Sequence, residues 1–286
     1  MTRTVYVNGA FLPEAEAKVS VFDRGFLMAD AVYEVTSVLD GRILDFPGHA
    51  ARLRRSLGEL GMPMPMDEDA LLALHQDMVA RNDLLDGMVY LQVTRGAASE
   101  RDFAYPDPST PQTVVLFTQA KPGLADSPAA RTGIKVVTVP DHRWGRRDIK
   151  TVQLLYPSMG KMEAKARGAD DAWMVEDGQV TEGTSNNAWI VVGDRIVTRD
   201  TGPHILAGIT RATLLGVAES LQMRIEERPF TPNEARGASE AFVTSATTFV
   251  TPVVEIDGTP VGDGTPGPVA RRLREAYLEE ARRAAL

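Results

Sequence analysis

The chain has 286 residues, a length that allows either one large domain or two domains of about 140 residues each. Hydrophobic residues make up 43% of it and charged residues 24%, as in globular proteins, and the absence of cysteine excludes disulfides, catalytic thiolates and cysteine-ligated zinc or iron–sulfur clusters. A formal net charge of −8 disfavours nucleic acid and anionic membrane surfaces as partners. With no signal segment and no run of about 18 apolar residues, the chain is expected in the cytoplasm.

The first 120 residues alternate hairpins with helices, which predicts an N-terminal α/β domain. Asn8-Gly9 and Asp40-Gly41 are favoured two-residue hairpin turns between β-rich segments. Leu53, Leu57 and Leu60 recur at helical spacing, and Gly61 is suited to end that helix. The predicted elements are a hairpin within 4–13, a second hairpin formed by 32–38 and 43–46, helices at 47–60 and 67–85, and strands at 89–94 and 113–117.

Residues 121–131 lack periodicity and are rich in Pro, Gly and Ser, so they are predicted to form a linker between two domains. The C-terminal domain is expected over 132–286. Both domains mix hairpins with helices, which predicts an α+β or mixed α/β fold and not a regular doubly wound sheet. The predicted elements of the second domain are strands at 134–139, 172–175, 189–192, 241–245 and 252–256, and helices at 157–167, from 208 onward and at 268–285.

Several common site motifs are absent or poorly matched. Residues 262–267 satisfy the G-x-G-x-x-G pattern, but Pro266 interrupts it and too little chain follows to complete a βαβ unit, so a surface turn is expected. No Walker A, H-E-x-x-H or G-x-S-x-G motif occurs, and the four histidines are scattered. The sequence therefore gives no support to a metal site or a serine hydrolase.

Lys150 is the lysine whose surroundings suggest chemistry. Lysine accounts for only six of the 31 basic residues, and Lys150 follows Arg143, Arg146 and Arg147 and precedes an apolar stretch. Neighbouring cations and desolvation lower the pKa of an amine and favour Schiff-base formation. On this stretch alone, however, a solvated lysine in a basic loop is the simpler interpretation, and Glu182 alone is an ordinary turn residue.

A set of motifs in the order of the chain resembles the fold-type IV pyridoxal-phosphate aminotransferases. The motifs are Asp148-Ile149-Lys150, Thr181-Glu182-Gly183-Thr184-Ser185-Asn186-Asn187, Leu206-x-Gly208-Ile209-Thr210-Arg211, and Val243-Thr244-Ser245 with Thr251-Pro252-Val253. Within that class, a second set is most similar to the D-amino-acid aminotransferase (D-alanine transaminase) branch. It comprises Asp23-Arg24-Gly25, Val32-Tyr33-Glu34-Val35 and His49-x-x-Arg52-Leu53-x-x-Ser56. The resemblance implies a two-domain enzyme with pyridoxal 5'-phosphate as its cofactor.

The resemblance also implies a role for individual residues. Lys150 would carry the cofactor as a Schiff base and move a proton from the substrate α-carbon. Glu182 would hold the pyridine nitrogen protonated, and Leu206 would pack on one face of the ring.

Residues from three segments would bind the cofactor phosphate. Arg52 would pair with it bidentately, the backbone amides of Ile209 and Thr210 at a helix start would complete the anion site, and Thr247 is a candidate for a further contact. Ala246 stands where relatives often carry a hydroxyl.

On the substrate side, Tyr33 and Arg101 are the candidate donors to a carboxylate. The family pattern places a histidine two residues after that arginine, whereas this chain has Phe103. Substrate recognition is therefore expected to differ in detail. The resemblance further implies a homodimer in which the partner subunit supplies Arg101.

The preferred interpretation is amino transfer from a D-amino acid such as D-alanine to a 2-oxo acid such as 2-oxoglutarate. The alternatives are a branched-chain L-amino-acid aminotransferase, an (R)-amine transaminase and a 4-amino-4-deoxychorismate lyase. A catalytically silent relative that only binds cofactor or a partner would require the loss of Lys150 or Glu182, and both are present.

Overall fold

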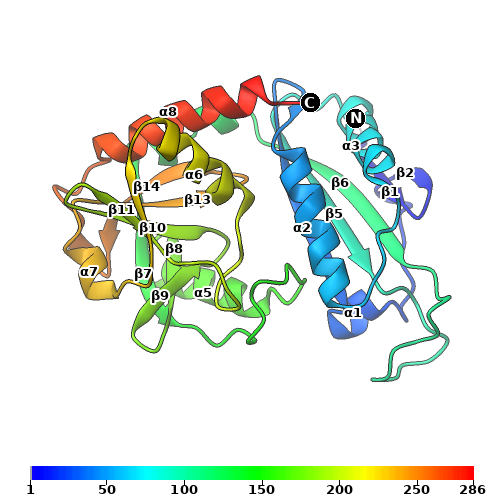
Figure 1. Cartoon of the computed structure of the whole chain (residues 1–286). Coiled ribbons are helices and arrows are strands. Elements are labelled where there is room, and N and C mark those ends of the chain that lie inside the picture. The colour runs from blue at the N-terminus through cyan, green and yellow to red at the C-terminus, as the bar shows by residue number, and fades with distance from the viewer. Residues whose placement is uncertain (1) are drawn as a thin grey trace. The chain divides into compact units, whose positions relative to one another are not determined.

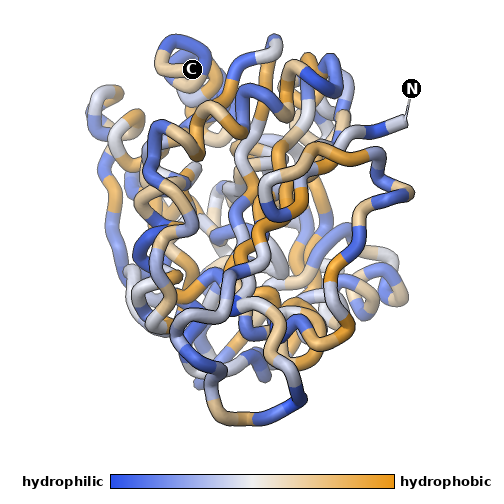
Figure 2. The backbone as a smooth tube through the Cα atoms, turned by 90° about the vertical axis from the view of Figure 1, so that its right-hand side faces the viewer, coloured by the Kyte–Doolittle hydropathy of each residue, from blue (hydrophilic) through white to orange (hydrophobic). Residues whose placement is uncertain are grey.

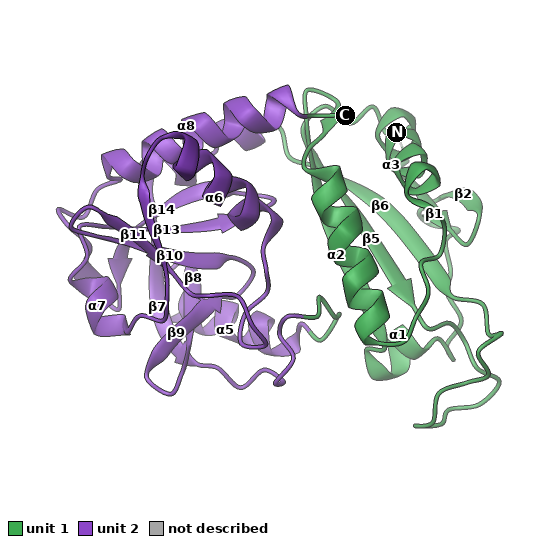
Figure 3. Ribbon diagram, in the orientation of Figure 1, with its two compact units in different colours: residues 1–122, 149–153, 285–286 green, residues 123–148, 154–284 purple. Residues whose placement is uncertain are grey.

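The computed structural model describes residues 2–286, which fall into two compact units (Figures 1 and 3). Unit 1 contains the chain up to Pro122, the segment Ile149–Gln153 and the C-terminal Ala285–Leu286. Unit 2 contains Gly123–Asp148 and Leu154–Ala284. The combination of sheets and helices in both units confirms the predicted α+β class.

Unit 1 is built on an antiparallel sheet with the strand order β2-β1-β6-β5-β3-β4. Its strands are β1 (Thr4–Val7), β2 (Ala10–Pro13), β3 (Ala31–Leu39), β4 (Arg42–Ile43), β5 (Gly87–Thr94) and β6 (Thr113–Ala120). Its helices are α1 (Arg24–Met28), α2 (Phe46–Glu59) and α3 (Glu68–Arg81), of which α2 packs on β3 and α3 on β1, β5 and β6. Alternate residues of the strands, such as Val89, Leu91 and Val93, are buried, as a sheet with one covered face requires.

The two predicted hairpin turns of unit 1 are confirmed. Asn8 and Gly9 both have positive φ, and so do Asp40 and Gly41. This backbone conformation is the one that a type I′ turn demands, and Asn, Asp and Gly adopt it at low cost.

Unit 2 is built on a mixed sheet with the strand order β12-β11-β10-β13-β14-β7-β8-β9, with β15 beside β14. Its strands are β7 (Ile134–Pro140), β8 (Asp171–Glu176), β9 (Gln179–Gly183), β10 (Asn187–Val192), β11 (Arg195–Thr198), β12 (Arg224–Glu227), β13 (Glu240–Ser245), β14 (Phe249–Ile256) and β15 (Thr259–Pro260). Its helices are η1 (Leu124–Asp126), α4 (Pro128–Thr132), α5 (Leu155–Ala166), α6 (Ile209–Ser220), α7 (Pro232–Arg236) and α8 (Pro268–Arg283). Large side chains fill its core, among them Trp173, Phe230 and Val243.

The compact units divide the chain differently from the expected domains 1–120 and 132–286. Residues 121–131 are not a plain linker, because they contain η1 and most of α4, and both belong to unit 2. The segment around Lys150 belongs to unit 1, because it is bonded to the free side of β3: the amide of Tyr33 donates to the Lys150 carbonyl (3.0 Å) and the amide of Val152 donates to the Ala31 carbonyl (3.2 Å). Such pairing between distant segments leaves no local pattern in the sequence.

Coloured by hydropathy, the backbone alternates between apolar and polar stretches over short distances (Figure 2). Among residues 2–286, no helix combines the length and the apolar character that crossing a membrane requires. In the same described part of the chain, no group of three or more His, Asp or Glu side chains is placed to hold a metal ion.

His75 of α3 is a packed core residue, as its position among leucines suggests. Its side chain is buried, its ring meets Phe46 edge-on with centroids 5.2 Å apart, and its Nδ1 lies 2.8 Å from the Leu71 carbonyl oxygen. Burial lowers the pKa of His75 to about 4, although the hydrogen bond to Leu71 opposes the change.

We therefore expect His75 to decrease the free energy of unfolding as the pH is lowered from 6.5, the ordinary pKa of histidine, to about 4. Over this interval the unfolded chain binds a proton on His75 more readily than the folded chain, at a cost on the order of 3 kcal/mol. Urea unfolding of His75→Leu should show a weaker pH dependence than the wild type, whereas His142→Gln, at an exposed position, should not. An identical pH dependence for wild type and His75→Leu would contradict this assignment.

Candidate active site

Lys150 is held in unit 1 at its backbone and at the end of its side chain. Its carbonyl accepts the hydrogen bond from Tyr33 of β3, and its amide donates to Ser56 Oγ of α2 (3.3 Å). Its Nζ lies 4.2 Å from the centroid of the Tyr33 ring. The amine therefore rests on the face of an aromatic ring, whose negative potential attracts a cation.

The Tyr33 ring is supported by a row of aromatic side chains across the sheet. Tyr33 stacks on Tyr90 (5.6 Å between centroids, 22° between planes), and Tyr90 stacks on Phe117 (4.6 Å, 19°). The Tyr90 hydroxyl donates to Gln92 Oε1 (2.8 Å). Burial raises the pKa of Tyr90, and its neighbour Tyr33 adds to the effect, so this ring stays neutral. The row fixes the orientation of the ring on which Lys150 lies.

A second buried cluster of unit 1 surrounds Glu34. Arg52 Nε donates to Glu34 Oε1 (2.8 Å) and Arg52 Nη2 to Oε2 (2.7 Å), while His49 Nδ1 lies 2.7 Å from Oε2. Burial favours a raised pKa for Glu34, but the Arg52 charge and the hydrogen bonds from Arg52 and His49 outweigh it and lower the pKa to about 2. In this structure Arg52 thus makes its bidentate pair with a carboxylate of its own unit. Glu34 and His49 are not recognisable from the sequence as partners of Arg52.

Arg101 and Phe103 lie in the exposed connection between β5 and β6. The Arg101 guanidinium lies 5.1 Å from the centroid of the Phe103 ring, and Phe103 is 79% exposed. The connection is anchored by Arg24, whose Nη1 donates to the carbonyls of Asp102 (2.7 Å) and Ala104 (3.1 Å). Its backbone is therefore held while the side chains at its tip face solvent. The structure does not place Arg101 against Lys150 or Tyr33 within unit 1.

Glu182 is not a turn residue, as its local sequence suggested, but part of β9 in unit 2. It is buried (4% exposed), and both carboxylate oxygens accept hydrogen bonds. Arg143 Nη1 donates to Oε1 (2.6 Å), while the Leu206 amide (3.1 Å) and Asn187 Nδ2 (3.0 Å) donate to Oε2. Burial raises the pKa of Glu182 even though the charge and hydrogen bond of Arg143 act against the rise.

The three arginines that precede Lys150 in sequence are each bound to acidic groups, so they do not form an uncompensated positive cluster. Arg143 Nη2 lies 2.7 Å from Asp141, Arg146 Nε lies 3.0 Å from Asp148, and Arg147 Nη2 lies 2.6 Å from Glu176. Each has a carboxylate partner that the local sequence does not reveal.

The start of α6 in unit 2 offers backbone amides to an anion. Gly208 precedes the helix and supplies no capping side chain to the amides of Ile209 and Thr210. A Cβ atom at Gly208 would lie 2.1 Å from Asn187 Oδ1, so a larger residue here would displace the Asn187 side chain from its bonds to Glu182 and Leu206. The uncapped helix start has the donors and the positive dipole end that a phosphate prefers. Thr247 lies in the turn between β13 and β14.

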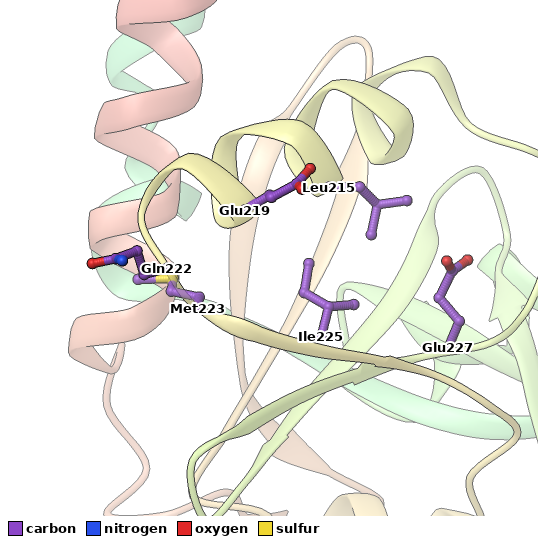
Figure 4. A pocket seen from close by; sticks show the side chains of 6 residues that line it. All are labelled: Leu215, Glu219, Gln222, Met223, Ile225 and Glu227. Carbon is purple, nitrogen blue, oxygen red and sulfur yellow. The ribbon is translucent and has the colours of Figure 1, made fainter.

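A pocket on unit 2 involves none of these residues. It lies between α6 and β12, with Leu215, Met223 and Ile225 as its apolar lining (Figure 4). Glu227 at its edge is paired with Arg211 (2.6 Å). The pocket therefore does not belong to the predicted site.

The predicted site residues are distributed over both units. Unit 1 contains Lys150, Tyr33, Arg52 and Arg101, of which Lys150 and Tyr33 are in contact. The remaining predicted residues lie in unit 2: Glu182, Leu206, Ile209, Thr210 and Thr247. Among them, the Leu206 amide donates a hydrogen bond to Glu182.

Comparison with known proteins links this arrangement to one family. A family model described as amino-transferase class IV matches residues 31–256. The D-alanine aminotransferase of Staphylococcus aureus (strain MSSA476) is 36% identical over 273 residues, which cover 96% of this chain and 96% of the relative. That of Bacillus licheniformis is 37% identical over 273 residues, which cover 95% of each chain.

Solved structures are similar over the same length. A branched-chain amino acid aminotransferase from T.th., solved with pyridoxamine 5'-phosphate, superposes with a TM-score of 0.89 at 28% identity, covering 98% of this chain and 94% of the other. The Escherichia coli branched-chain amino acid aminotransferase, at 20% identity and a TM-score of 0.88, covers 98% and 95% and shows the shared fold. The chain belongs to the class IV aminotransferases, in the D-amino-acid aminotransferase branch, and is a pyridoxal-phosphate-dependent transaminase with the fold of type IV.

Proposed function

We propose that the chain transfers the amino group of D-alanine or a related D-amino acid to a 2-oxo acid such as 2-oxoglutarate. The observation that carries the proposal is the 36% identity to a D-alanine aminotransferase over 96% of both chains. The branched-chain aminotransferases share the fold at lower identity, 28% or less among those compared above. No contact in the structure favours an (R)-amine transaminase, a 4-amino-4-deoxychorismate lyase or a silent relative.

The residues present fit pyridoxal 5'-phosphate. When bound, this cofactor acts as the electron sink for the carbanion formed at the substrate α-carbon. The chain offers a lysine amine held on an aromatic face, a buried carboxylate on β9, and the start of α6, which Gly208 precedes without a capping side chain. These are the groups that an aldehyde, a ring nitrogen and a phosphate each require.

Lys150 Nζ would hold the cofactor and would take the proton from the substrate α-carbon. The contacts of its backbone with Tyr33 and Ser56 fix the base of the side chain, while the Tyr33 ring limits where the amine can go. The amine can thus swing over a short range without losing its position, as a group that both binds and transfers a proton must.

Glu182 would favour a proton on the ring nitrogen of the cofactor, since a buried carboxylate stabilises a cationic partner. Leu206 donates its amide to Glu182, and its side chain would pack on the ring. Arg52, the amides of Ile209 and Thr210, and Thr247 would bind the phosphate.

Tyr33 and Arg101 bind the substrate carboxylate, and Phe103 contributes no hydrogen bond to it.

We further propose that the protein acts as a homodimer. Large apolar side chains are exposed in the described part of both units, including Phe26 (71%) and Phe103 (79%) in unit 1 and Leu155 (77%) in unit 2, as at surfaces that become covered on association. A cytoplasmic location is likewise our proposal, and cell fractionation tests it.

Borohydride reduction of the holoenzyme followed by peptide mapping should place the cofactor on Lys150. Lys161 is the matched control: it lies on α5 with its Nζ 3.3 Å from Asp171, and Lys161→Ala should still be labelled at Lys150. Lys150→Ala should lose transaminase activity by several orders of magnitude, because it removes the amine that would hold the cofactor and move the proton. A label found on any other lysine would contradict the assignment.

Arg52→Ala should weaken binding of pyridoxal 5'-phosphate by roughly tenfold or more, since it removes a charge-assisted contact to the phosphate. It also leaves Glu34 buried without its guanidinium partner, which should lower the stability of the apoenzyme by about 3 kcal/mol or more. Equilibrium dialysis and urea unfolding measure the two effects. Arg54→Ala on the same helix removes only an exposed pair with Glu68 and should change neither. Unchanged cofactor affinity in Arg52→Ala would rule out the phosphate role.

Arg101→Ala should raise KM for D-alanine by roughly tenfold or more, because it removes a cation that binds the substrate carboxylate. The absorbance of the bound cofactor should stay unchanged. Arg131→Ala, which removes an exposed arginine paired with Asp126, is the control and should keep the wild-type KM. An unaltered KM in Arg101→Ala, or equal wild-type rates with D- and L-alanine, would count against the proposed substrate.

A further inference from the structure

We propose that Arg143 and Asp141 are positioning residues that fix the charge and orientation of the Glu182 carboxylate and, through it, keep the ring nitrogen of the cofactor protonated. This inference rests on the proposed role of Glu182. It assigns a task to two side chains that touch neither the reacting atoms of the substrate nor, in the proposed roles, the cofactor itself.

The Arg143 guanidinium joins the two carboxylates by different edges. Its Nη1 donates to Glu182 Oε1 (2.6 Å), while its Nε and Nη2 donate to Asp141 Oδ1 (3.0 Å) and Oδ2 (2.7 Å). Asp141 is also tied to the strand of Glu182, because Thr181 Oγ1 donates to Asp141 Oδ2 (2.7 Å). The planar guanidinium is thereby fixed in orientation, and its remaining edge is directed at Glu182.

Both carboxylate oxygens of Glu182 consequently accept hydrogen bonds that fix the orientation of the group. Arg143 occupies Oε1, and neutral donors occupy Oε2, namely the Leu206 amide and Asn187 Nδ2. Rotation of the carboxylate would break at least one of these bonds in a buried site, where an unpaired polar group is costly. The direction in which Glu182 can accept one more hydrogen bond is therefore set by its partners.

The charges around Glu182 point to a cationic ligand. Among the described side chains, the network contains Arg143 and Arg147 as cations and Asp141, Glu176 and Glu182 as anions. The net charge of these five side chains is −1. A protonated ring nitrogen supplies the missing positive charge, whereas a neutral ring nitrogen would leave the network with an uncompensated buried charge.

Arg143 determines whether the proton lies on Glu182 or on the ring nitrogen of the cofactor. A fully buried carboxylate without a cation takes up a proton, and burial already raises the pKa of Glu182. Arg143 stabilises the carboxylate far more than it stabilises the neutral acid, because only the carboxylate carries a full charge. The proton is therefore placed on the ring nitrogen and not on Glu182. Asp141 limits the effect by sharing the guanidinium, which leaves Glu182 able to attract a further cation.

The test compares variants as holoenzymes loaded with cofactor labelled with ¹⁵N in the ring. The ¹⁵N chemical shift reports protonation of the ring nitrogen independently of turnover. In Arg143→Gln the signal should move toward that of the unprotonated ring, and kcat for D-alanine should fall tenfold or more with little change in KM. Arg143→Lys restores a cation and should recover most of the protonated signal. Arg167→Gln removes a cation of unit 2 that pairs with Glu163 and Asp257 and lies outside this network, so it should keep the wild-type signal.

A protonated ring signal together with wild-type kcat in Arg143→Gln would overturn the proposal. If that variant does not fold, Asp141→Asn keeps Arg143 and removes its second carboxylate. Its ring nitrogen should lose the proton at a lower pH than in the wild type, and an unchanged pH would overturn the proposal equally. Glu182→Gln tests the proposed role of Glu182 separately from the proposed role of Arg143. If this variant keeps the protonated signal, the proposed role of Glu182 itself fails, whatever Arg143 does.

Discussion

A carboxylate buried against a guanidinium occurs in each unit, and the predicted chemistry depends on the difference between the two pairs. In unit 1, Glu34 receives two bonds from Arg52 and a third contact from His49, and its pKa falls to about 2. In unit 2, burial raises the pKa of Glu182, and Arg143, which also binds a second carboxylate, opposes the rise. Glu34 is thus a fixed anion with no tendency to take up a proton. Glu182 depends on Arg143 to remain a carboxylate, and in its proposed role that carboxylate would hold the protonated ring nitrogen.

Strand β3 organises the half of the site in unit 1. Successive side chains of a strand point to opposite faces, so Tyr33 and Glu34 serve different neighbours. Tyr33 lies under the Lys150 amine, and Glu34 faces α2 and binds Arg52. The free side of the same strand binds the backbone of the Lys150 segment. One strand therefore sets the positions of the amine, its aromatic support and the arginine on α2.

The sequence was sufficient for features that depend on local patterns. The Asn8-Gly9 and Asp40-Gly41 turns and the amphipathic helices follow from backbone preference and hydrophobic spacing. Strand β9 was missed because it spans only Gln179–Gly183 and follows the Asp177-Gly178 turn, so turn residues dominate the local signal. Lys150 and Glu182 were identified through resemblance, since neither has a local context that demands chemistry.

What could not be predicted is the pairing of charges across the chain. Arg143 and Glu182 are 39 positions apart, and Arg52 and Glu34 are 18 apart. Where a charged residue has several possible partners, the sequence does not show with which of them it forms an ion pair. The fold alone decides that Arg143 bonds to Glu182 while Arg147, equally basic, bonds to Glu176. The assignment of Lys150 to unit 1 is of the same kind, because it depends on hydrogen bonds to β3.

The departure from the family pattern at Phe103 lies where the fold tolerates change. The connection that carries it is fixed through its backbone, by donation from Arg24 to the carbonyls of Asp102 and Ala104, and not through the side chains at its tip. A substitution at an exposed tip costs little stability because no core contact is lost. Histidine and phenylalanine can therefore be exchanged there without disturbing the anchor, although only histidine can donate a hydrogen bond. In the proposed roles the substrate carboxylate would then rely on Arg101, which lies in this exposed connection, and on Tyr33, whose ring is held by stacking on Tyr90. Of these two residues, only Arg101 lies where the fold leaves the side chain free to change.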